Sequence, residues 1–310
     1  MKKIYCIGEL LVDFIGQTGQ GIVHSSQFSK LAGGAPANVA AAISKLGGKS
    51  AFLGQVGADS FGTFLLGSLN ELGIDVTLCT QAGKTTLAFV ALDRSGERDF
   101  EFYRGSDGDY QLPEAQLQQQ IASEDIIHFG SATALLGGKL RTSYFQLLEF
   151  ADSNGNFISF DPNFRENLVT PDLLANFIHD CKTFISYADV VKLSESEAQL
   201  ISGEDDLEKA ATYLQYVGAK TVIITLGSKG AMICNSSGSR TIPSRIIQAV
   251  DTTGAGDAFV GGLLFKIAQH VEPSWDSFVA FANLVGAFTC TNYGAIRAMP
   301  TMRQFLEFIN

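Results

Sequence analysis

The chain has 310 residues, 46% of them hydrophobic and 17% charged, a balance that can bury a sizeable core and that excludes a disordered polypeptide. Its 22 basic and 32 acidic residues give a net charge of −10, which argues against nucleic acid or an anionic membrane as a partner. The five cysteines are scattered without a CxxC pair, so we expect neither a zinc site nor a disulfide framework and predict a cytoplasmic protein.

Strand-like and helix-like runs alternate along the chain. The predicted strands are Ile4–Ile7, Ser50–Val56, Ile126–Phe129, Phe157–Phe160, Val190–Leu193 and Val222–Leu226. The predicted helices are Ala37–Leu46, Phe61–Leu72, Leu140–Ala151, Leu207–Val217, Ala255–Gln269, Ser274–Thr291 and Thr301–Ile309. This alternation indicates an α/β fold with a central, mostly parallel β-sheet flanked by helices on both faces. With no repeat and no linker, we expect one domain over residues 1–310.

Two stretches interrupt this alternation. Residues 14–31 and 77–104 are β-like, with turns at Gly19-Gln20-Gly21 and Arg94-Ser95-Gly96 and no predicted helix. They fit a small antiparallel sheet inserted beside the main one. A pair of ordinary hairpins on the edge of the main sheet explains the same pattern.

The segment Asp251-Thr252-Thr253-Gly254-Ala255-Gly256-Asp257 immediately precedes an apolar run with helical spacing. A tight turn of small residues that opens a helix presents unpaired N–H groups and the positive end of the helix dipole, which together bind anions. Asp257 would lie at the same place and could accept a proton. The alternative is an ordinary loop-to-helix connection in which Asp257 caps the helix.

A second glycine-rich element, Ala32-Gly33-Gly34-Ala35-Pro36-Ala37-Asn38, lies far upstream. Its two glycines allow a ligand to approach the backbone closely, and Pro36 suits the first turn of a helix. Asn38 offers donors and an acceptor beside the glycines, as needed to bind a hydroxylated ligand. The alternative is a strand-to-helix turn in which Asn38 bonds to the backbone.

The two glycine-rich elements, in this order, resemble the two signatures of the ribokinase-like (PfkB) carbohydrate kinase family. The resemblance covers essentially the whole chain, and its pattern is closest to the fructokinases. Supporting stretches are Gly8–Asp13, Thr86–Val90, Gly96–Arg98, Phe102–Arg104 and Asp161–Arg165. The resemblance implies a ribokinase-like fold in which the small sheet is a lid over a sugar, and a homodimer that pairs through this lid.

The resemblance also implies ATP-dependent phosphorylation of a free sugar hydroxyl, with D-fructose as the expected substrate. Asp257 would be the general base, and the amides of Gly254, Ala255 and Gly256 would stabilise charge on the transferring phosphoryl group. The residues expected to bind the sugar are Asp13, Gly33, Gly34, Asn38, Phe102, Arg104, Asn163 and Arg165. Asp13 alone could equally cap a loop, Phe102 could belong to the lid core, and Arg165 could be an ordinary surface charge.

The cofactors implied are ATP and Mg²⁺, with K⁺ as a further expectation. The residues expected to bind the nucleotide are Lys192, Ser194, Thr225, Gly227, Ser228, Gly230, Gly254, Gly256 and Asn283. Glu197 would contact Mg²⁺ through water, whereas Asp251, Thr253 and Gly294 would belong to a monovalent cation site. Ser194 stands where the family has asparagine, which leaves its role open.

Other functions remain open at this point. Within the same fold, the substrate could be ribose, 2-keto-3-deoxygluconate or a nucleoside. A different class is a non-catalytic sensor of a sugar or nucleotide, although such a protein need not keep Asp257 and both flanking glycines.

Overall fold

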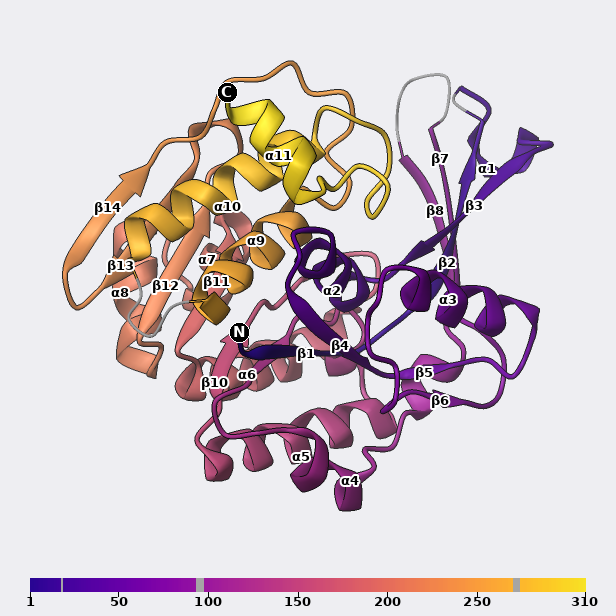
Figure 1. The fold of residues 1–310 in the computed structure, drawn as a ribbon, viewed down its shortest axis with the longest axis horizontal. Coiled ribbons are helices and arrows are strands. Elements are labelled where there is room, and N and C mark those ends of the chain that lie inside the picture. The colour runs from indigo at the N-terminus through magenta and orange to yellow at the C-terminus, as the bar shows by residue number, and fades with distance from the viewer. Residues whose placement is uncertain (18, 93–97, 270–273) are drawn as a thin grey trace.

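The computed structural model describes residues 1–17, 19–92, 98–269 and 274–310. Its central sheet runs in the order β14-β13-β12-β11-β10-β9-β1-β4 (Figure 1). The strands are β1 (Lys3–Ile7), β4 (Lys49–Leu53), β9 (Ile126–Phe129), β10 (Phe157–Phe160), β11 (Val190–Ser194), β12 (Thr221–Thr225), β13 (Ala231–Asn235) and β14 (Gly238–Ile242). Strands β4 through β12 pair in parallel, and β13 and β14 add an antiparallel edge. The predicted mostly parallel sheet is confirmed.

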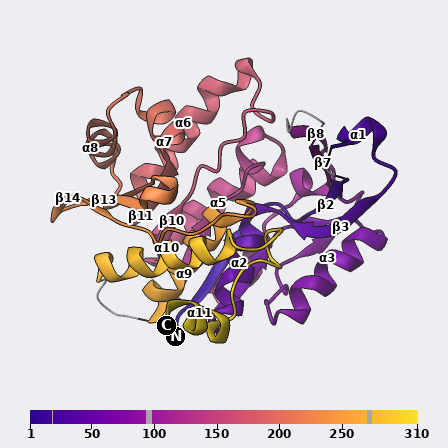
Figure 2. The ribbon, with the colours of Figure 1, turned by 90° about the horizontal axis from the view of Figure 1, so that it is seen from above.

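Helices cover both faces of this sheet, as the view in Figure 2 shows. One layer contains α4 (Glu114–Gln120), α5 (Lys139–Asn154), α6 (Pro171–Tyr187), α7 (Glu195–Ser202) and α8 (Leu207–Val217). The other contains α2 (Ala35–Lys45), α3 (Ser60–Glu71), α9 (Ala255–Gln269), α10 (Trp275–Thr289) and α11 (Met302–Ile309). Strands covered on both faces must be apolar throughout, and every residue of β9 is buried. None of the described helices has the length and apolar character needed to cross a bilayer.

A second, small sheet projects from the main body beside α3 (Figure 1). Its order is β3-β2-β7-β8, from β2 (Leu11–Gly16), β3 (Phe28–Gly33), β7 (Leu87–Leu92) and β8 (Arg98–Tyr103). We call it the small sheet. Its strands come from both of the β-like stretches noted in the sequence.

The small sheet differs from the prediction in two respects. Strands β2 and β7 pair in parallel, so the sheet is mixed and not purely antiparallel, because these two strands leave the main body in the same direction. A short helix, α1 (Gly21–His24), also lies where no helix was predicted. The turn predicted at Arg94-Ser95-Gly96 lies outside the described residues, whereas the strands β7 and β8 on either side of it are described.

Other elements depart from the sequence prediction. The strand predicted at Ser50–Val56 is divided at Gly54 into β4 and β5 (Gln55–Val56), which pairs with β6 (Thr80–Gln81). A Cβ at Gly54 would lie 2.4 Å from the Gly8 carbonyl oxygen, so glycine permits the two chain segments to approach at this break. The helices α4, α6 and α7, the hairpin β13–β14 and the 3₁₀ turns η1 (Ser106–Asp109), η2 (Ala134–Leu136) and η3 (Gly227–Lys229) were not predicted.

Local signals for two of these helices are present in the chain. Helix α6 has Pro171 at its first position and Asp172 in its first turn, both typical of a helix start. Helix α7 begins with a capping box between Ser194 and Glu197, in which each residue satisfies a backbone N–H of the other. Both helix starts therefore have signals in the sequence.

Candidate active site

A large cavity with a volume of about 720 Å³ lies between the small sheet and the loops that follow β10, β11 and β12. The carboxyl ends of parallel strands are where open α/β sheets bind ligands. A second cavity of about 340 Å³ adjoins it and shares Thr225, Thr252 and Gly256 with it. The start of α9 therefore lies between two cavities.

The segment before α9 makes the tight turn expected from its small residues. Gly254 has φ +75°, and a Cβ there would lie 2.7 Å from the Ala295 Cβ, so only glycine fits this turn. A Cβ at Gly256 would face open space apart from the Lys192 Nζ, at 3.5 Å. The Ala255 amide donates to the Thr252 carbonyl at 3.2 Å, which leaves Gly254 and Gly256 as the better anion donors among the three residues predicted.

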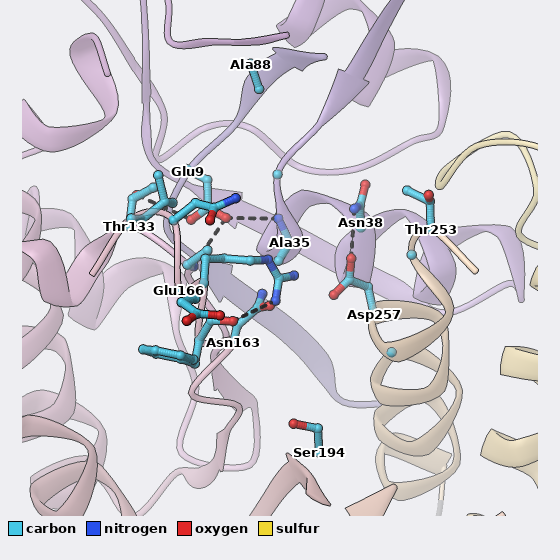
Figure 3. Close-up of a pocket in the computed structure, with 18 of the residues that line it drawn as sticks. Glu9, Ala35, Asn38, Ala88, Thr133, Asn163, Glu166, Ser194, Thr253 and Asp257 are labelled. Carbon is cyan, nitrogen blue, oxygen red and sulfur yellow. Dashed lines mark hydrogen bonds between the residues drawn. The ribbon is translucent and has the colours of Figure 1, made fainter. Parts of the chain in front are cut away.

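Asp257 is buried in the first turn of α9. Its Oδ2 accepts a hydrogen bond from Asn38 Nδ2 at 2.8 Å (Figure 3). Burial raises the pKa of the Asp257 carboxyl, and the bond from Asn38 and the charge of Arg165 oppose that rise. A carboxyl with a raised pKa is a better proton acceptor than an exposed aspartate, so the site suits a general base.

Asn38 has a second polar atom available. Its Oδ1 is buried and has no hydrogen-bond partner among the described residues, and the side chain lines the large cavity. Buried polar atoms are nearly always satisfied, so this oxygen needs a partner that the chain itself does not supply. A hydroxyl of a ligand would satisfy it.

Asp13 also lines the large cavity. Burial raises the pKa of its carboxyl to about 7, with further contributions from the charges of Glu9 and Asp257. A Cβ at Gly33 would lie 1.9 Å from Asp13 Oδ2. Gly33 therefore makes room for the Asp13 carboxylate and does not itself line the cavity, whereas Gly34 does.

The loop after β10 brings cationic and amide groups to the cavity. Asn163 has φ +46° and donates through Nδ2 to the Gly130 carbonyl at 2.9 Å. Arg165 lines the cavity, and its Nη1 donates to the Phe164 carbonyl at 3.1 Å.

Lys192, in β11, donates through Nζ to Asp161 Oδ2 at 3.0 Å. Burial alone would lower the pKa of Lys192, but the charges of Asp161 and Glu197 outweigh it and the pKa is raised, so the ammonium stays charged.

Ser194 and Glu197 both line the large cavity, but they also bond to each other. The Ser194 hydroxyl donates to Glu197 Oε2 at 2.9 Å, and the Ser194 amide donates to the same oxygen at 2.7 Å. The Phe164 amide donates to Glu197 Oε1 at 2.7 Å. Glu197 therefore joins the loops after β10 and β11.

Phe102 in β8 and Arg104 just after it were both expected to bind the sugar, but only one of them lines the cavity. Phe102 lines the cavity, as expected. Arg104 is not among the lining residues, and its guanidinium donates to Asp107 Oδ2 at 3.4 Å and to the Thr133 carbonyl at 3.0 Å. Arg104 therefore bonds to the backbone of Thr133 at the cavity wall and does not itself line the cavity.

The residues predicted to bind the nucleotide divide between the two cavities. Gly227, Ser228, Gly230 and Asn283 line the smaller one, Lys192, Ser194 and Gly254 line the larger one, and Thr225 and Gly256 line both. Asn283 Nδ2 donates to the Ile242 carbonyl at 2.9 Å. The residues predicted for the nucleotide thus line two adjoining cavities.

Asp251, Thr253 and Gly294 are brought together. Asp251 Oδ1 accepts from the Thr253 amide at 2.9 Å and Oγ1 at 2.7 Å, and its Oδ2 accepts from the Gly294 amide at 2.9 Å. Within the described residues, no group of three or more His, Cys, Asp or Glu side chains could hold a metal ion. A cation here would depend on backbone oxygens.

Several lining residues were not among the predicted ones. Glu9 and Thr133 are buried at the cavity wall, and Glu166 and Asn167 extend the loop after β10. Figure 3 shows Glu9 and Thr133 together beside Ala35. Thr133 follows the fully buried strand β9, and a polar residue just after such a strand is a signal that could have identified it.

Comparisons with known proteins agree with this geometry. The family model for pfkB family carbohydrate kinases matches residues 1–302. A probable fructokinase-5 of Arabidopsis thaliana is 38% identical, over 96% of this chain and 94% of that protein. A fructokinase of Xylella fastidiosa with bound ATP is 31% identical with a TM-score of 0.86, covering 99% of this chain and 98% of that one. A double-mutant fructokinase of Vibrio cholerae, with fructose, ADP and a potassium ion bound, is 30% identical with a TM-score of 0.87, covering 100% and 99%.

The match extends over nearly the whole chain, and it includes both glycine-rich elements that meet at Asn38 and Asp257. This chain belongs to the pfkB family of carbohydrate kinases.

Proposed function

We propose that this protein is an ATP-dependent fructokinase, which transfers the γ-phosphoryl group of ATP to a hydroxyl of free D-fructose. The observation that carries the proposal is the buried Asp257 at the start of α9, which faces the large cavity and is bonded to Asn38. The fructokinase relatives and the neighbour with bound fructose and ADP support the choice of sugar.

In this mechanism, Asp257 takes the proton of the acceptor hydroxyl as the phosphoryl group is transferred. The hydroxyl oxygen becomes a phosphate ester oxygen, and the bond from the γ-phosphorus to the ADP oxygen breaks. The amides of Gly254 and Gly256 would stabilise the charge on the transferring group, with Ala255 contributing less because its amide is already bonded. Lys192, whose ammonium lies near Gly256, would neutralise phosphate charge from the other side.

The sugar would lie between Asn38, Asp13 and the loop after β10. Asn38 Oδ1 can accept a hydroxyl proton, and Asp13 can accept one or two. Asn163 and Arg165 would bind from the opposite wall, and Phe102 would cover an apolar face of the sugar. Arg104 would contribute through its bonds to Asp107 and to the Thr133 carbonyl, since it does not line the cavity.

The nucleotide would extend from the smaller cavity, past Thr225 and Gly256, into the larger one. Mg²⁺ would neutralise phosphate charge, bound mainly through phosphates and waters. Glu197 fits an outer role only, because three of its roughly four lone-pair directions already accept hydrogen bonds. We further propose that carbonyls near Asp251, Thr253 and Gly294 hold a monovalent cation, as K⁺ is bound in the Vibrio cholerae neighbour.

We also propose that residues 1–310 form one domain whose lid is the small sheet, drawn from the stretches 14–31 and 77–104. Its outer face carries an aromatic cluster, in which the rings of Phe14 and Phe89 stack at 4.9 Å and Tyr103 is 56% exposed. Such a face suits a second lid, and hence a homodimer. The cytoplasmic location stays a prediction from cysteine usage.

A substrate panel tests the proposal. Fructose, ribose, 2-keto-3-deoxygluconate and a nucleoside are each assayed with Mg-ATP, and ADP release is measured together with phosphorylated product. Fructose should give the highest kcat/KM. Preference for another acceptor would replace the substrate while keeping the kinase, whereas binding of sugar and ATP without product would favour a sensor.

A further inference from the structure

The chain passes between the main body and the small sheet at separate crossings. One lies between β1 and β2, at residues 8–10, and one between β3 and α2, at Gly34. Further crossings precede β7, at residues 82–86, and follow β8, at residues 104–105. Any rotation of the small sheet over the sugar cavity must take place at these crossings.

Asp107 joins the two crossings beside β7 and β8. Its side chain is fully buried. Its Oδ1 accepts from the Thr86 hydroxyl, and its Oδ2 accepts from Arg104 Nε at 3.4 Å. The Gly105 amide donates to Thr86 Oγ1 at 2.9 Å, which leaves the hydroxyl proton of Thr86 to point toward Asp107. One carboxylate thus holds the start of β7 and the end of β8.

Glu9 joins the other two crossings. It lies between β1 and β2 and is also fully buried. Its Oε1 accepts from the Ala35 amide at 3.0 Å, at the start of α2, and from the Ala132 amide at 3.3 Å. Its Oε2 accepts from the Ser131 hydroxyl. Glu9 therefore ties the first strands of the small sheet to the loop after β9.

Thr133, in the same loop, connects the two carboxylates. Its hydroxyl donates to Asp107 Oδ2 at 2.8 Å and lies 3.5 Å from Glu9 Oε2. We call Glu9, Thr86, Arg104, Asp107 and Thr133 the hinge cluster. Because the polar side chains of the cluster other than Arg104 are buried, a shift of the small sheet would leave buried polar groups without partners, at a large free-energy cost.

Within the hinge cluster, Glu9 and Thr133 line the sugar cavity themselves, and Thr86 and Arg104 each lie two residues from a lining residue. Thr86 precedes Ala88 on β7, Arg104 follows Phe102 on β8, and Ala88 and Phe102 pair across the two strands. Asp107 and Thr86 themselves do not line the cavity. An effect of either residue on sugar binding must therefore be transmitted through the strands or through Thr133, which lines the cavity and bonds to Asp107.

We propose that Asp107 is a positioning residue for the sugar site, which acts through Thr86 and Arg104 to fix the small sheet over the cavity. Together with Glu9 and Thr133, it joins every described crossing to the loop after β9. Phe102 and Ala88 then meet the sugar at a set position, and the binding energy of the sugar is not consumed in ordering the lid. The proposal rests on the proposed function only for its choice of fructose as the probe.

The test uses two substitutions outside the cavity. Asp107→Asn puts a donor where the carboxylate accepted from two hydroxyls and a guanidinium. Thr86→Val removes one hydroxyl at nearly constant shape, and Thr86→Ser is its matched control because it keeps the hydroxyl. Asp180→Asn, which removes a buried carboxylate paired with Arg141 in the main body, controls for a general loss of stability.

We expect Asp107→Asn and Thr86→Val to raise KM for fructose about tenfold, which corresponds to the loss of roughly one charge-assisted hydrogen bond. The value of kcat should change by less than about threefold. In the ligand-free protein, amide hydrogen exchange should become faster in β7 and β8 and stay unchanged in β9 to β12. Thr86→Ser should keep the wild-type KM for fructose and the wild-type exchange rates in β7 and β8, and Asp180→Asn should change neither quantity.

A lower unfolding midpoint with unchanged KM and unchanged exchange in β7 and β8 would overturn the proposal, since it would show a purely structural role. If Asp107→Asn does not fold, the Thr86→Val and Thr86→Ser pair decides alone. The exchange measurement needs no substrate, so a wild-type protein that fails to phosphorylate fructose would refute the proposed function without refuting the positioning role of Asp107.

Discussion

Asn38 and Asp257 lie 219 residues apart in the chain, and Asn38 Nδ2 donates to Asp257 Oδ2 at 2.8 Å. This bond joins the two glycine-rich elements, since Asn38 lies in the first turn of α2 and Asp257 in the first turn of α9. The donor stabilises the charged form of the carboxyl and fixes its orientation. The other end of the Asn38 amide stays available to a sugar hydroxyl.

Removal of this donor should change the pH dependence of the reaction. The bond from Asn38 opposes the rise that burial causes in the pKa of Asp257. In Asn38→Ala, the acid limb of the kcat/KM profile should therefore move to higher pH. Asn156→Ala, which removes a buried amide bonded to the Ala122 carbonyl far from the cavity, should leave the profile in place. A profile for Asn38→Ala that matches the wild type would show that the bond does not tune the base.

Asp13 should destabilise the folded protein at neutral pH. Burial raises the pKa of its carboxyl to about 7, above the ordinary value of about 4. Between these two values the folded protein holds a proton that the unfolded chain has lost, so the free energy of unfolding falls as pH rises through this window.

Asp13→Asn should therefore raise the free energy of unfolding at about pH 8, by roughly 2–4 kcal/mol, and raise it much less at about pH 4. The same substitution should increase KM for fructose, because the amide accepts fewer hydroxyl protons. Denaturant unfolding at the two pH values measures the first effect. Equal or lower stability of the variant at about pH 8 would contradict a carboxylate whose charged form is disfavoured in the folded protein.

Gly33 should be required for the position of Asp13 and not for folding. A Cβ at Gly33 would lie 1.9 Å from Asp13 Oδ2, so Gly33→Ala should displace the carboxylate and raise KM for fructose by about tenfold or more. The matched control is Gly67→Ala in α3, where a Cβ meets nothing within 4 Å. That change should leave kinetics unaltered and raise stability by up to about 1 kcal/mol. Kinetics of Gly33→Ala equal to those of Gly67→Ala would remove Asp13 from the sugar site.

Lys192 should contribute to the chemical step. Its ammonium lies close to Gly256 and is paired with the buried Asp161. Lys192→Met should lower kcat by about 10²- to 10³-fold, because a preorganised charge beside the transferring group is lost. The control is Lys220→Met, which removes a lysine that pairs with Asp189 and whose side chain is 75% exposed. This change should leave kcat unchanged. Steady-state kinetics with varied ATP separate kcat from KM, and a kcat within about threefold of wild type would exclude this role.

The sequence allowed prediction of those features that depend on local chemistry. The turn of small residues before Asp257 and the glycine-rich element around Asn38 each indicated a ligand site by their local chemistry, whereas the polar residues after β10 and β11 were expected from the family resemblance. The alternation of strands and helices was sufficient for the mostly parallel sheet. These signals are local, so one chain without structure is enough to find them.

Features that depend on distant partners could not be predicted. Arg104 was expected at the sugar because nothing in the chain reveals Asp107 and the Thr133 carbonyl as its partners. The parallel pairing of β2 with β7 depends on where each strand leaves the main body. The bond from Asn38 to Asp257 was not expected either, since it spans most of the chain.

Substitution of Asp257 by asparagine tests the central claim most directly. The amide keeps the shape of the carboxyl but cannot take a proton at neutral pH. Calorimetric titration with fructose and with ATP should give affinities within about threefold of wild type, while kcat falls by at least about 10³-fold. An Asp257→Asn variant that binds both ligands and keeps most of its turnover would show that Asp257 is not the base of this enzyme.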